Sequence, residues 1–142
     1  MIYPVLNIAK YIIKHEHDAG REISNLRLQK LLYFVQAKFL AEKRPPCFSD
    51  PIEAWDFGPV VLSVYHEYKM FGGLDILTSE TECSIDSETS SVIDNILDYC
   101  APYPSYQLSD IAHSQQPYIR ARQNLFSTVI TIDAMRQFFQ KE

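Results

Sequence analysis

The chain has 142 residues, of which 46% are hydrophobic and 22% charged, and its formal net charge is −5. These values are typical of a soluble globular protein of one domain, long enough to bury a core without disulfides. The acidic balance without a basic stripe argues against direct binding of DNA or RNA.

The three cysteines, Cys47, Cys83 and Cys100, lie far apart and form no Cys-x-x-Cys pair. This spacing predicts neither a disulfide framework nor a zinc site, and it indicates a reducing cytosol. The N-terminus lacks the pattern of a signal peptide, and no apolar run is long enough to span a bilayer. We therefore expect a cytoplasmic protein without a cofactor and without membrane contact.

Two amphipathic helices are predicted in the first 45 residues. Pro4 fits the first turn of one helix, which Gly20 ends, and Ser24 or Asn25 caps the next, which Pro45 ends. Their short connection predicts an antiparallel pair. The apolar stripes are Val5, Ile8, Ala9, Ile12 and Ile13 in the first helix, and Leu28, Leu31, Leu32, Val35 and Phe39 in the second.

The segment after residue 51 holds the one tryptophan of the chain, Trp55, within an alternating run over 52–57 that predicts a short strand. Gly58 supplies backbone freedom, and Pro59 sits where a first helical residue would, because its missing N–H costs nothing there. The helix that follows is expected to end at Gly72. The segment is therefore predicted to be a strand-to-helix corner, with Trp55 anchored in the core and contact with a partner as the less favoured alternative for Trp55.

The rest of the chain alternates loops and short helices. Residues 74–84 read as an acidic surface loop, and the turn signals then predict helices beginning near Asp86, Ser105, Pro117 and Ile132. A brief strand is expected at 128–131. The predicted fold class is mainly α: a compact helical bundle formed by residues 1–142 as one domain, with a minor two-stranded β element in which 52–57 and 128–131 pair.

Candidate catalytic groups are few. His15 and His17 are two residues apart and so point to nearly opposite faces of a helix, which does not fit metal binding. Ser109 and His113 share a helix face but lack the strained turn of a nucleophile elbow. The four glycines leave no phosphate-binding loop. We predict no enzyme activity and no catalytic or metal residue, and we keep a hydrolase using Ser109 and His113 as the least favoured alternative.

Seven acidic residues and no basic residue lie between Asp75 and Asp98. The simpler interpretation is a solvated loop and helix face. The alternative is a surface complementary to a basic partner protein, with Glu80, Glu82, Asp86 and Glu88 as its candidates. Arg120 and Arg122 are expected to form ion pairs with this acidic segment.

Two groups of motifs resemble the Panacea domain of the SocA-like antitoxins, a family long described as phage-associated proteins of unknown function. Leu28-Gln-Lys-Leu-Leu-Tyr33 and Glu53-Ala-Trp-Asp-Phe-Gly-Pro-Val-Val61 carry the first group. Leu108-Ser-Asp-Ile-Ala-His113, followed by Pro117-Tyr118 and Ala121-Arg122, is similar to the second, with Ala112 and Tyr118 in place of the usual Thr and Trp. The matching positions are Gln29, Lys30, Tyr33, Ala54, Trp55, Gly58, Pro59, Val60, Tyr65, Gly72, His113 and Pro117.

The resemblance implies an antitoxin of a bacterial or prophage toxin–antitoxin system that neutralises its cognate toxin by direct protein–protein binding. Its motif residues are expected either to hold the fold or to contact the partner. Gln29 and Lys30 lie away from the apolar stripe of their helix, which fits solvent or an interface. The alternative function is an adaptor or phage regulatory protein that binds a host protein, for example to deliver it for proteolysis.

Overall fold

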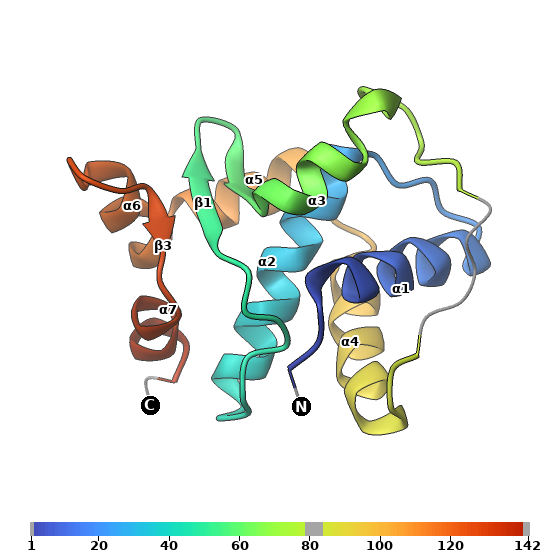
Figure 1. Cartoon of the computed structure of the whole chain (residues 1–142), viewed down its shortest axis with the longest axis horizontal. Coiled ribbons are helices and arrows are strands. Elements are labelled where there is room, and N and C mark those ends of the chain that lie inside the picture. The colour runs from blue at the N-terminus through green and yellow to red at the C-terminus, as the bar shows by residue number, and fades with distance from the viewer. Residues whose placement is uncertain (1, 79–83, 141–142) are drawn as a thin grey trace.

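The computed structural model describes residues 2–78 and 84–140, and this part of the chain is mainly helical with one small sheet (Figure 1). The helices are α1 (Val5–Asp18), α2 (Asn25–Ala41), α3 (Leu62–Glu67), α4 (Ser87–Cys100), α5 (Ser105–His113), α6 (Gln116–Gln123) and α7 (Ile132–Phe139), with a 3₁₀ helix, η1 (Lys69–Phe71). The strands are β1 (Ile52–Trp55), β2 (Gly58–Val60) and β3 (Val129–Ile130). The predicted fold class is confirmed. None of the described helices is both long enough and apolar enough to cross a membrane.

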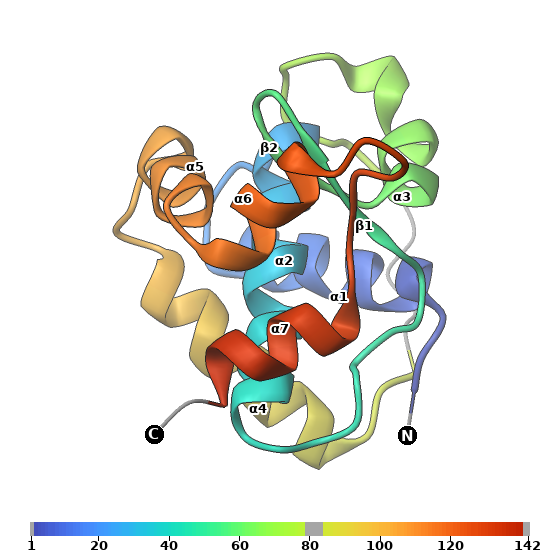
Figure 2. The same cartoon turned by 90° about the vertical axis from the view of Figure 1, so that its left-hand side faces the viewer.

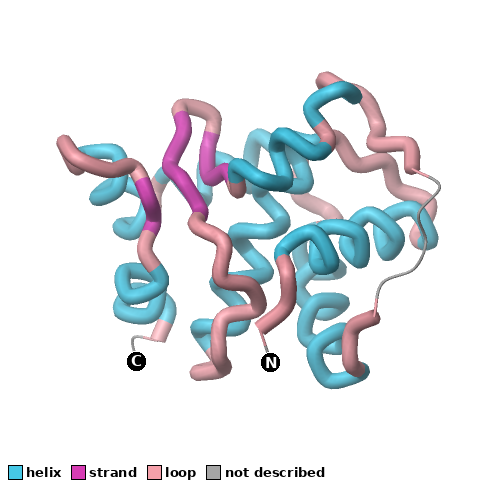
Figure 3. Tube along the Cα trace, in the orientation of Figure 1, coloured by secondary structure: helices cyan, strands magenta, loops and turns pink. Residues whose placement is uncertain are grey.

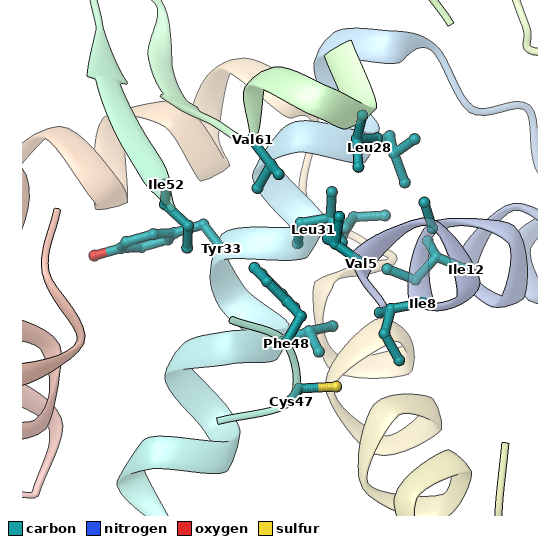
Figure 4. Packing of buried hydrophobic residues seen from close by; sticks show 14 of the residues in the cluster. Val5, Ile8, Ile12, Leu28, Leu31, Tyr33, Cys47, Phe48, Ile52 and Val61 are labelled. Carbon is teal, nitrogen blue, oxygen red and sulfur yellow. The ribbon is translucent and has the colours of Figure 1, made fainter. Parts of the chain in front are cut away.

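Helix α2 lies at the centre of the molecule, with the other helices and the sheet arranged around it (Figures 1 and 2). All the apolar positions predicted for it are buried. Figure 4 shows how side chains of α1, α2 and the segment of Cys47 and Phe48 meet in one cluster. Because apolar residues occupy several faces of α2, the helix has to be covered on nearly all sides.

The ends of the first two helices follow local signals. Ser24 Oγ accepts a hydrogen bond from the backbone N–H of Arg27 at 3.2 Å, as expected of a cap. Helix α2 ends at Ala41, four residues before Pro45, because Lys43 adopts a φ of +62° and the N–H of Arg44 bonds to the carbonyl of Phe39 at 3.0 Å. The end predicted from the prolines was therefore too late.

The antiparallel arrangement predicted for the first two helices is wrong. Figures 1 and 2 both show α1 running across α2 rather than alongside it. The apolar stripe of α1 is buried as predicted, but it packs against α3 and α4 as well as α2. The direction of α1 is set by its packing against all three helices. The short loop between α1 and α2 does not determine it.

The two extended segments pair as predicted, with Ile52 opposite Ile130 and Glu53 opposite Val129. A third strand was missed. Strand β2 pairs with β1 in a hairpin, so that the sheet order is β2-β1-β3.

Residue 59 therefore does not begin a helix. Pro59 lies opposite Ala54 in the hairpin, and helix α3 starts three residues later, at Leu62. Proline suits an edge strand as well as a first helical turn, because both positions tolerate the missing N–H.

The second half of the chain keeps its predicted order of helices and loops (Figure 3). Asp86 caps α4 by accepting from the N–H of Thr89 at 2.8 Å, and Pro117 lies in the first turn of α6. Ser105 is the first residue of α5 rather than its cap, which is Pro104. Helix α7 runs from Ile132 to Phe139, beside the lower half of α2 in Figures 1 and 2.

Candidate functional site: a clamped hairpin that carries an aromatic row

Five polar side chains of α2 are buried, and each bonds to another segment or to another of the five. They are Asn25, Gln29, Lys30, Tyr33 and Gln36. Gln29 Oε1 accepts from the N–H of Val61 at 2.8 Å, at the junction of β2 and α3, while its amide nitrogen donates to Asn25 at 2.9 Å. Asn25 in turn donates to the carbonyl of Tyr65 at 3.0 Å. This pair holds the chain where it leaves the hairpin.

Lys30 and Ser109 converge on a single carbonyl in the turn of the hairpin. Lys30 Nζ donates to the carbonyl oxygen of Phe57 at 3.0 Å, and Ser109 Oγ of α5 donates to the same oxygen at 2.7 Å. Lys30 is only 3% exposed, and this burial lowers its pKa to about 8. Its ammonium group also lies 5.7 Å from the centre of the Phe57 ring.

Gly58 has to be glycine because of these two donors. Its φ is +122°, a conformation that side chains disfavour, and a Cβ built there would lie 2.9 Å from Ser109 Oγ and 3.5 Å from Lys30 Nζ. The glycine therefore lets α2 and α5 approach the turn closely enough to bond to it.

Helix α6 holds the other arm of the hairpin. The hydroxyl of Tyr118 donates to the carbonyl of Trp55, and the guanidinium of Arg122 donates to the carbonyl of Ala54 at 3.1 Å. Arg122 also pairs with Asp56 in the turn, and it forms no salt bridge with those residues of the acidic segment that the structure describes. The hairpin is thus clamped from α2, α5 and α6, so that the two motif groups of the sequence meet at one place.

The interface or solvent role predicted for the polar face of α2 is wrong, because Gln29 and Lys30 are buried. Tyr33 is buried too, and burial raises its pKa. Its hydroxyl points away from the apolar cluster of Figure 4 and donates to Gln115 at 2.6 Å. The sequence contained a signal for this burial. Because α2 has apolar residues on several faces, it must be covered on nearly all sides, and its polar residues are then buried as well.

Other motif residues have structural positions. Ala54, Pro59, Val60 and Pro117 are buried, and Gly72 has a φ of +58° after η1. The ring of His113 packs on Tyr118 with centroids 4.6 Å apart, and its Nε2 is buried without a hydrogen-bond partner among the described residues.

Four side chains of the hairpin and α3 form a continuous row on the outer side of the clamp. The ring of Trp55 lies 5.6 Å from that of Phe57 and 5.2 Å from that of Tyr65, and Tyr65 lies 6.0 Å from His66. We call these four residues the aromatic row. Trp55 and Tyr65 are half-buried, while Phe57 is 38% exposed and His66 is exposed. The prediction that Trp55 is anchored in the core is therefore wrong, because its ring lies at the surface between two other partly exposed rings.

Carboxylates accompany the aromatic row. Glu53 Oε1 accepts from the indole N–H of Trp55 at 2.9 Å, and Asp50 accepts from Ser63 of α3 at 3.3 Å. Glu67 is exposed at the end of α3. In the described part of the chain, no Lys or Arg forms a salt bridge with Asp50, Glu53 or Glu67.

The acidic candidates of the sequence are placed differently. Asp86 is engaged within the fold, by the hydroxyl of Tyr3 and by the first turn of α4, and these hydrogen bonds lower its pKa to about 2. Glu88 pairs with Arg44 at 2.7 Å. Glu80 and Glu82 lie outside the described residues, so the acidic partner surface stays a prediction.

The groups considered for catalysis are occupied or buried. Ser109 and His113 do not hydrogen-bond to each other, and Ser109 Oγ is engaged at Phe57. Burial raises the pKa of the Cys47 thiol to about 12 and that of Cys100 to about 11, so neither is a thiolate at neutral pH, while Cys83 lies outside the described residues. Among the described residues, no group of three or more His, Cys, Asp and Glu side chains could hold a metal ion.

The comparisons with known proteins match the region of the clamp. The family model described as antitoxin SocA-like, Panacea domain, matches residues 28–118, from α2 to the first residues of α6. The chain is also similar to the antitoxin SocA of Caulobacter vibrioides (strain NA1000 / CB15N), with 50% identity over 50 residues. That alignment covers 35% of this chain and 27% of the relative, about a quarter of its length. No solved structure matches the chain. The matched model spans well over half of the sequence, and the chain belongs to the SocA-like antitoxin family with a Panacea domain.

Proposed function

We propose that this protein is an antitoxin that neutralises a protein toxin by direct, non-covalent binding. The name of the family and that of its similar relative support an antitoxin role. The observation that carries the mode of action is the clamped hairpin. Polar side chains from three helices fix its backbone, and its outer side presents the aromatic row to solvent.

This arrangement favours binding over turnover. The clamp uses its polar groups, including Lys30 and Ser109, to hold backbone carbonyls, so they are already occupied before any substrate arrives. Rigid aromatic side chains are effective anchors in protein interfaces, because they bury large areas while losing little conformational freedom. A fixed hairpin that displays such side chains therefore lowers the entropic cost of association.

The proposal is tested by co-expression and by measuring how much antitoxin is needed to inhibit a given amount of toxin. The protein encoded beside this chain in its source genome is expressed alone and together with this chain, and growth is measured. We expect growth arrest that co-expression relieves. With purified components, the residual toxin activity should fall linearly with added antitoxin and vanish near equimolar amounts.

Two outcomes contradict direct inhibition. Loss of the toxin activity at far less than equimolar antitoxin would indicate catalysis. Rescue in cells that requires a host protease, without inhibition by the purified protein, would support the adaptor alternative instead.

A further inference from the structure

The aromatic row lies in the longest stretch of the chain's first half without a Lys or Arg side chain, and His66 is the one histidine of this stretch. Residues 45–68 contain four acidic residues, Asp50, Glu53, Asp56 and Glu67, and no Lys or Arg. Of these four, only Asp56 has a cationic partner in the described structure, Arg122. Elsewhere the carboxylates close to a Lys or Arg are paired, for example Glu16 with Arg21 and Glu42 with Lys38, both at 2.9 Å.

Glu53 gives the strongest evidence for an acidic group beside the aromatic row. One of its carboxylate oxygens accepts the indole N–H of Trp55, which fixes the carboxylate at the edge of the aromatic row. Its second oxygen, Oε2, accepts no hydrogen bond within the part of the chain that the structure describes. A half-buried aromatic ring and an unneutralised carboxylate thus lie side by side at the surface.

Arginine is the side chain that this combination fits best. Its planar guanidinium stacks on aromatic faces and donates to carboxylates in a fixed geometry, and it is less strongly hydrated than the ammonium of lysine. Phe57 of the aromatic row is 38% exposed, and Leu62, the first residue of α3, is 37% exposed. Both suit the apolar residues that flank such an anchor.

We propose that the aromatic row, with Asp50, Glu53 and Glu67, is the surface that contacts the toxin, and that it receives a segment of the toxin bearing arginine beside apolar side chains. This inference rests on the proposed function for the identity of the partner. The preference for arginine rests on the charge and the aromatic side chains of the surface alone.

The two described candidates of the competing acidic surface, Asp86 and Glu88, are engaged by contacts within the fold. Asp86 is held by Tyr3 and by Thr89, and Glu88 is neutralised by Arg44, so a basic partner would first have to displace these groups. Helix α4, which contains Glu88 and is capped by Asp86, lies at the opposite end of the molecule from the turn of the hairpin in Figures 1 and 2. It therefore offers a distant control of equal charge.

The first experiment uses a peptide probe and needs no toxin. Trp55 is the one tryptophan of the chain, so its fluorescence reports on the aromatic row directly. Hexa-arginine should change this fluorescence saturably, more tightly than hexa-lysine, and hexa-glutamate should not. The double variant E53Q/E67Q should weaken hexa-arginine binding by about threefold to tenfold, whereas the matched control E88Q/D98N on α4 should leave it unchanged.

Three results would overturn the surface assignment: no saturable response to hexa-arginine, equal binding of hexa-lysine, or equal losses in the two double variants. None of them bears on the antitoxin role, because the probe is not a toxin.

The second experiment uses the toxin that the co-expression assay identifies. E53Q/E67Q should slow association and raise the Kd of the complex by about fivefold or more, and Trp55→Ala should raise it by roughly thirtyfold or more. E88Q/D98N should bind as the unaltered chain does. Thermal unfolding is recorded for each variant, and if Trp55→Ala does not fold, E53Q/E67Q alone decides.

The two proposals fail in different ways. Full affinity of E53Q/E67Q for a toxin that the unaltered chain neutralises would place the contact elsewhere and leave the antitoxin role intact. Arginine-selective peptide binding without any neutralised toxin would contradict the proposed function and support only the arginine selectivity of the aromatic row.

Discussion

The two sides of the β1–β2 hairpin differ in how their polar groups are used. On the inner side, the carbonyls of Ala54, Trp55 and Phe57 each accept from a side chain of α2, α5 or α6. On the outer side, Glu53 has one oxygen engaged by Trp55 and no cationic partner in the described structure.

This difference indicates that the inner side of the hairpin stabilises the fold, whereas its outer side is available to bind a partner. A buried donor or acceptor that loses its partner costs the fold free energy, so changes on the inner side should be felt in unfolding. The outer side chains are partly solvated and make few bonds within the chain, so changes there should be felt in binding. Each prediction below tests one side of this comparison, from the largest expected effect to the smallest.

Gly58→Ala is expected to be the most damaging change. It places a side chain at a φ of +122° and a Cβ within 2.9 Å of Ser109 Oγ, so it should lower the free energy of unfolding by about 2–5 kcal/mol. Urea denaturation measures the loss. Gly73→Ala is the control, because nothing lies within 4 Å of its Cβ, and it should change stability by less than about 1 kcal/mol.

A double-mutant cycle sharpens this prediction. Ser109→Ala removes the hydroxyl that the new methyl group meets, so Gly58→Ala should cost less in the Ser109→Ala background than alone. Strictly additive losses would show that the close approach of α5 does not explain the need for glycine at this position.

Lys30 should give the inner side a dependence on pH. Its pKa is lowered to about 8 in the folded protein and is near 10.4 in the unfolded chain, so the unfolded chain holds more protons between these values. The penalty for burying the cation is full below pH 8 and is relieved as the pH rises. Relative to Lys30→Met, the unaltered chain should gain about 1–3 kcal/mol of stability between pH 7.5 and pH 10.

The comparison with Lys30→Met is needed because other groups act in the opposite direction. Burial raises the pKa of Cys47 and Tyr33, so the unfolded chain loses these protons first and stability falls in the same range of pH. Both proteins share that loss. A difference between the two curves that stays constant with pH would contradict the burial of a charged Lys30.

Tyr118→Phe should have a moderate effect, because it removes the hydroxyl that donates to the carbonyl of Trp55 and leaves that carbonyl without this donor. We expect a loss of about 1 kcal/mol in urea denaturation. Tyr106→Phe, at a residue that is 65% exposed, is the control and should change nothing measurable. Equal losses in the two variants would argue against the clamp from α6.

Glu53→Gln should be the mildest change for stability. The glutamine retains an oxygen that can accept from Trp55, so unfolding should shift by less than about 0.5 kcal/mol. The same variant should weaken binding of hexa-arginine. A variant that loses stability but keeps binding would reverse the roles assigned to the two sides of the hairpin.

The predictable parts of the fold are those that depend on local patterns. The apolar spacing of α1 and α2, the caps at Ser24 and Asp86, and the pairing of 52–57 with 128–131 all appear in the structure. Strand β2 was not predicted from the sequence, because Gly58 and Pro59 are compatible with a helix start as well as with a hairpin. The choice between them is made by Gln29 and Lys30, some thirty residues earlier, which bind the turn and its exit.

The sequence predicted most residues of the candidate site, but it did not predict which of them contact one another. The family motifs mark Lys30, Trp55, Gly58 and Tyr65, and all four take part in the clamp or in the aromatic row. Ser109 and Arg122 were considered for other roles, since nothing local shows that they reach the hairpin. Trp55 was assigned to the core because the segment was predicted to be a strand-to-helix corner, yet only the packing of β1 decides which side Trp55 faces.

The sequence by itself determined the family, the mainly helical fold and the positions of most helices, because these depend on periodicity, caps and motifs within a few residues. The tertiary structure alone decided which motif residues hold the hairpin and which of its side chains remain outside. Burial and hydrogen bonding between distant segments set that division, and a carboxylate is available to a partner only where the fold brings no cation to it.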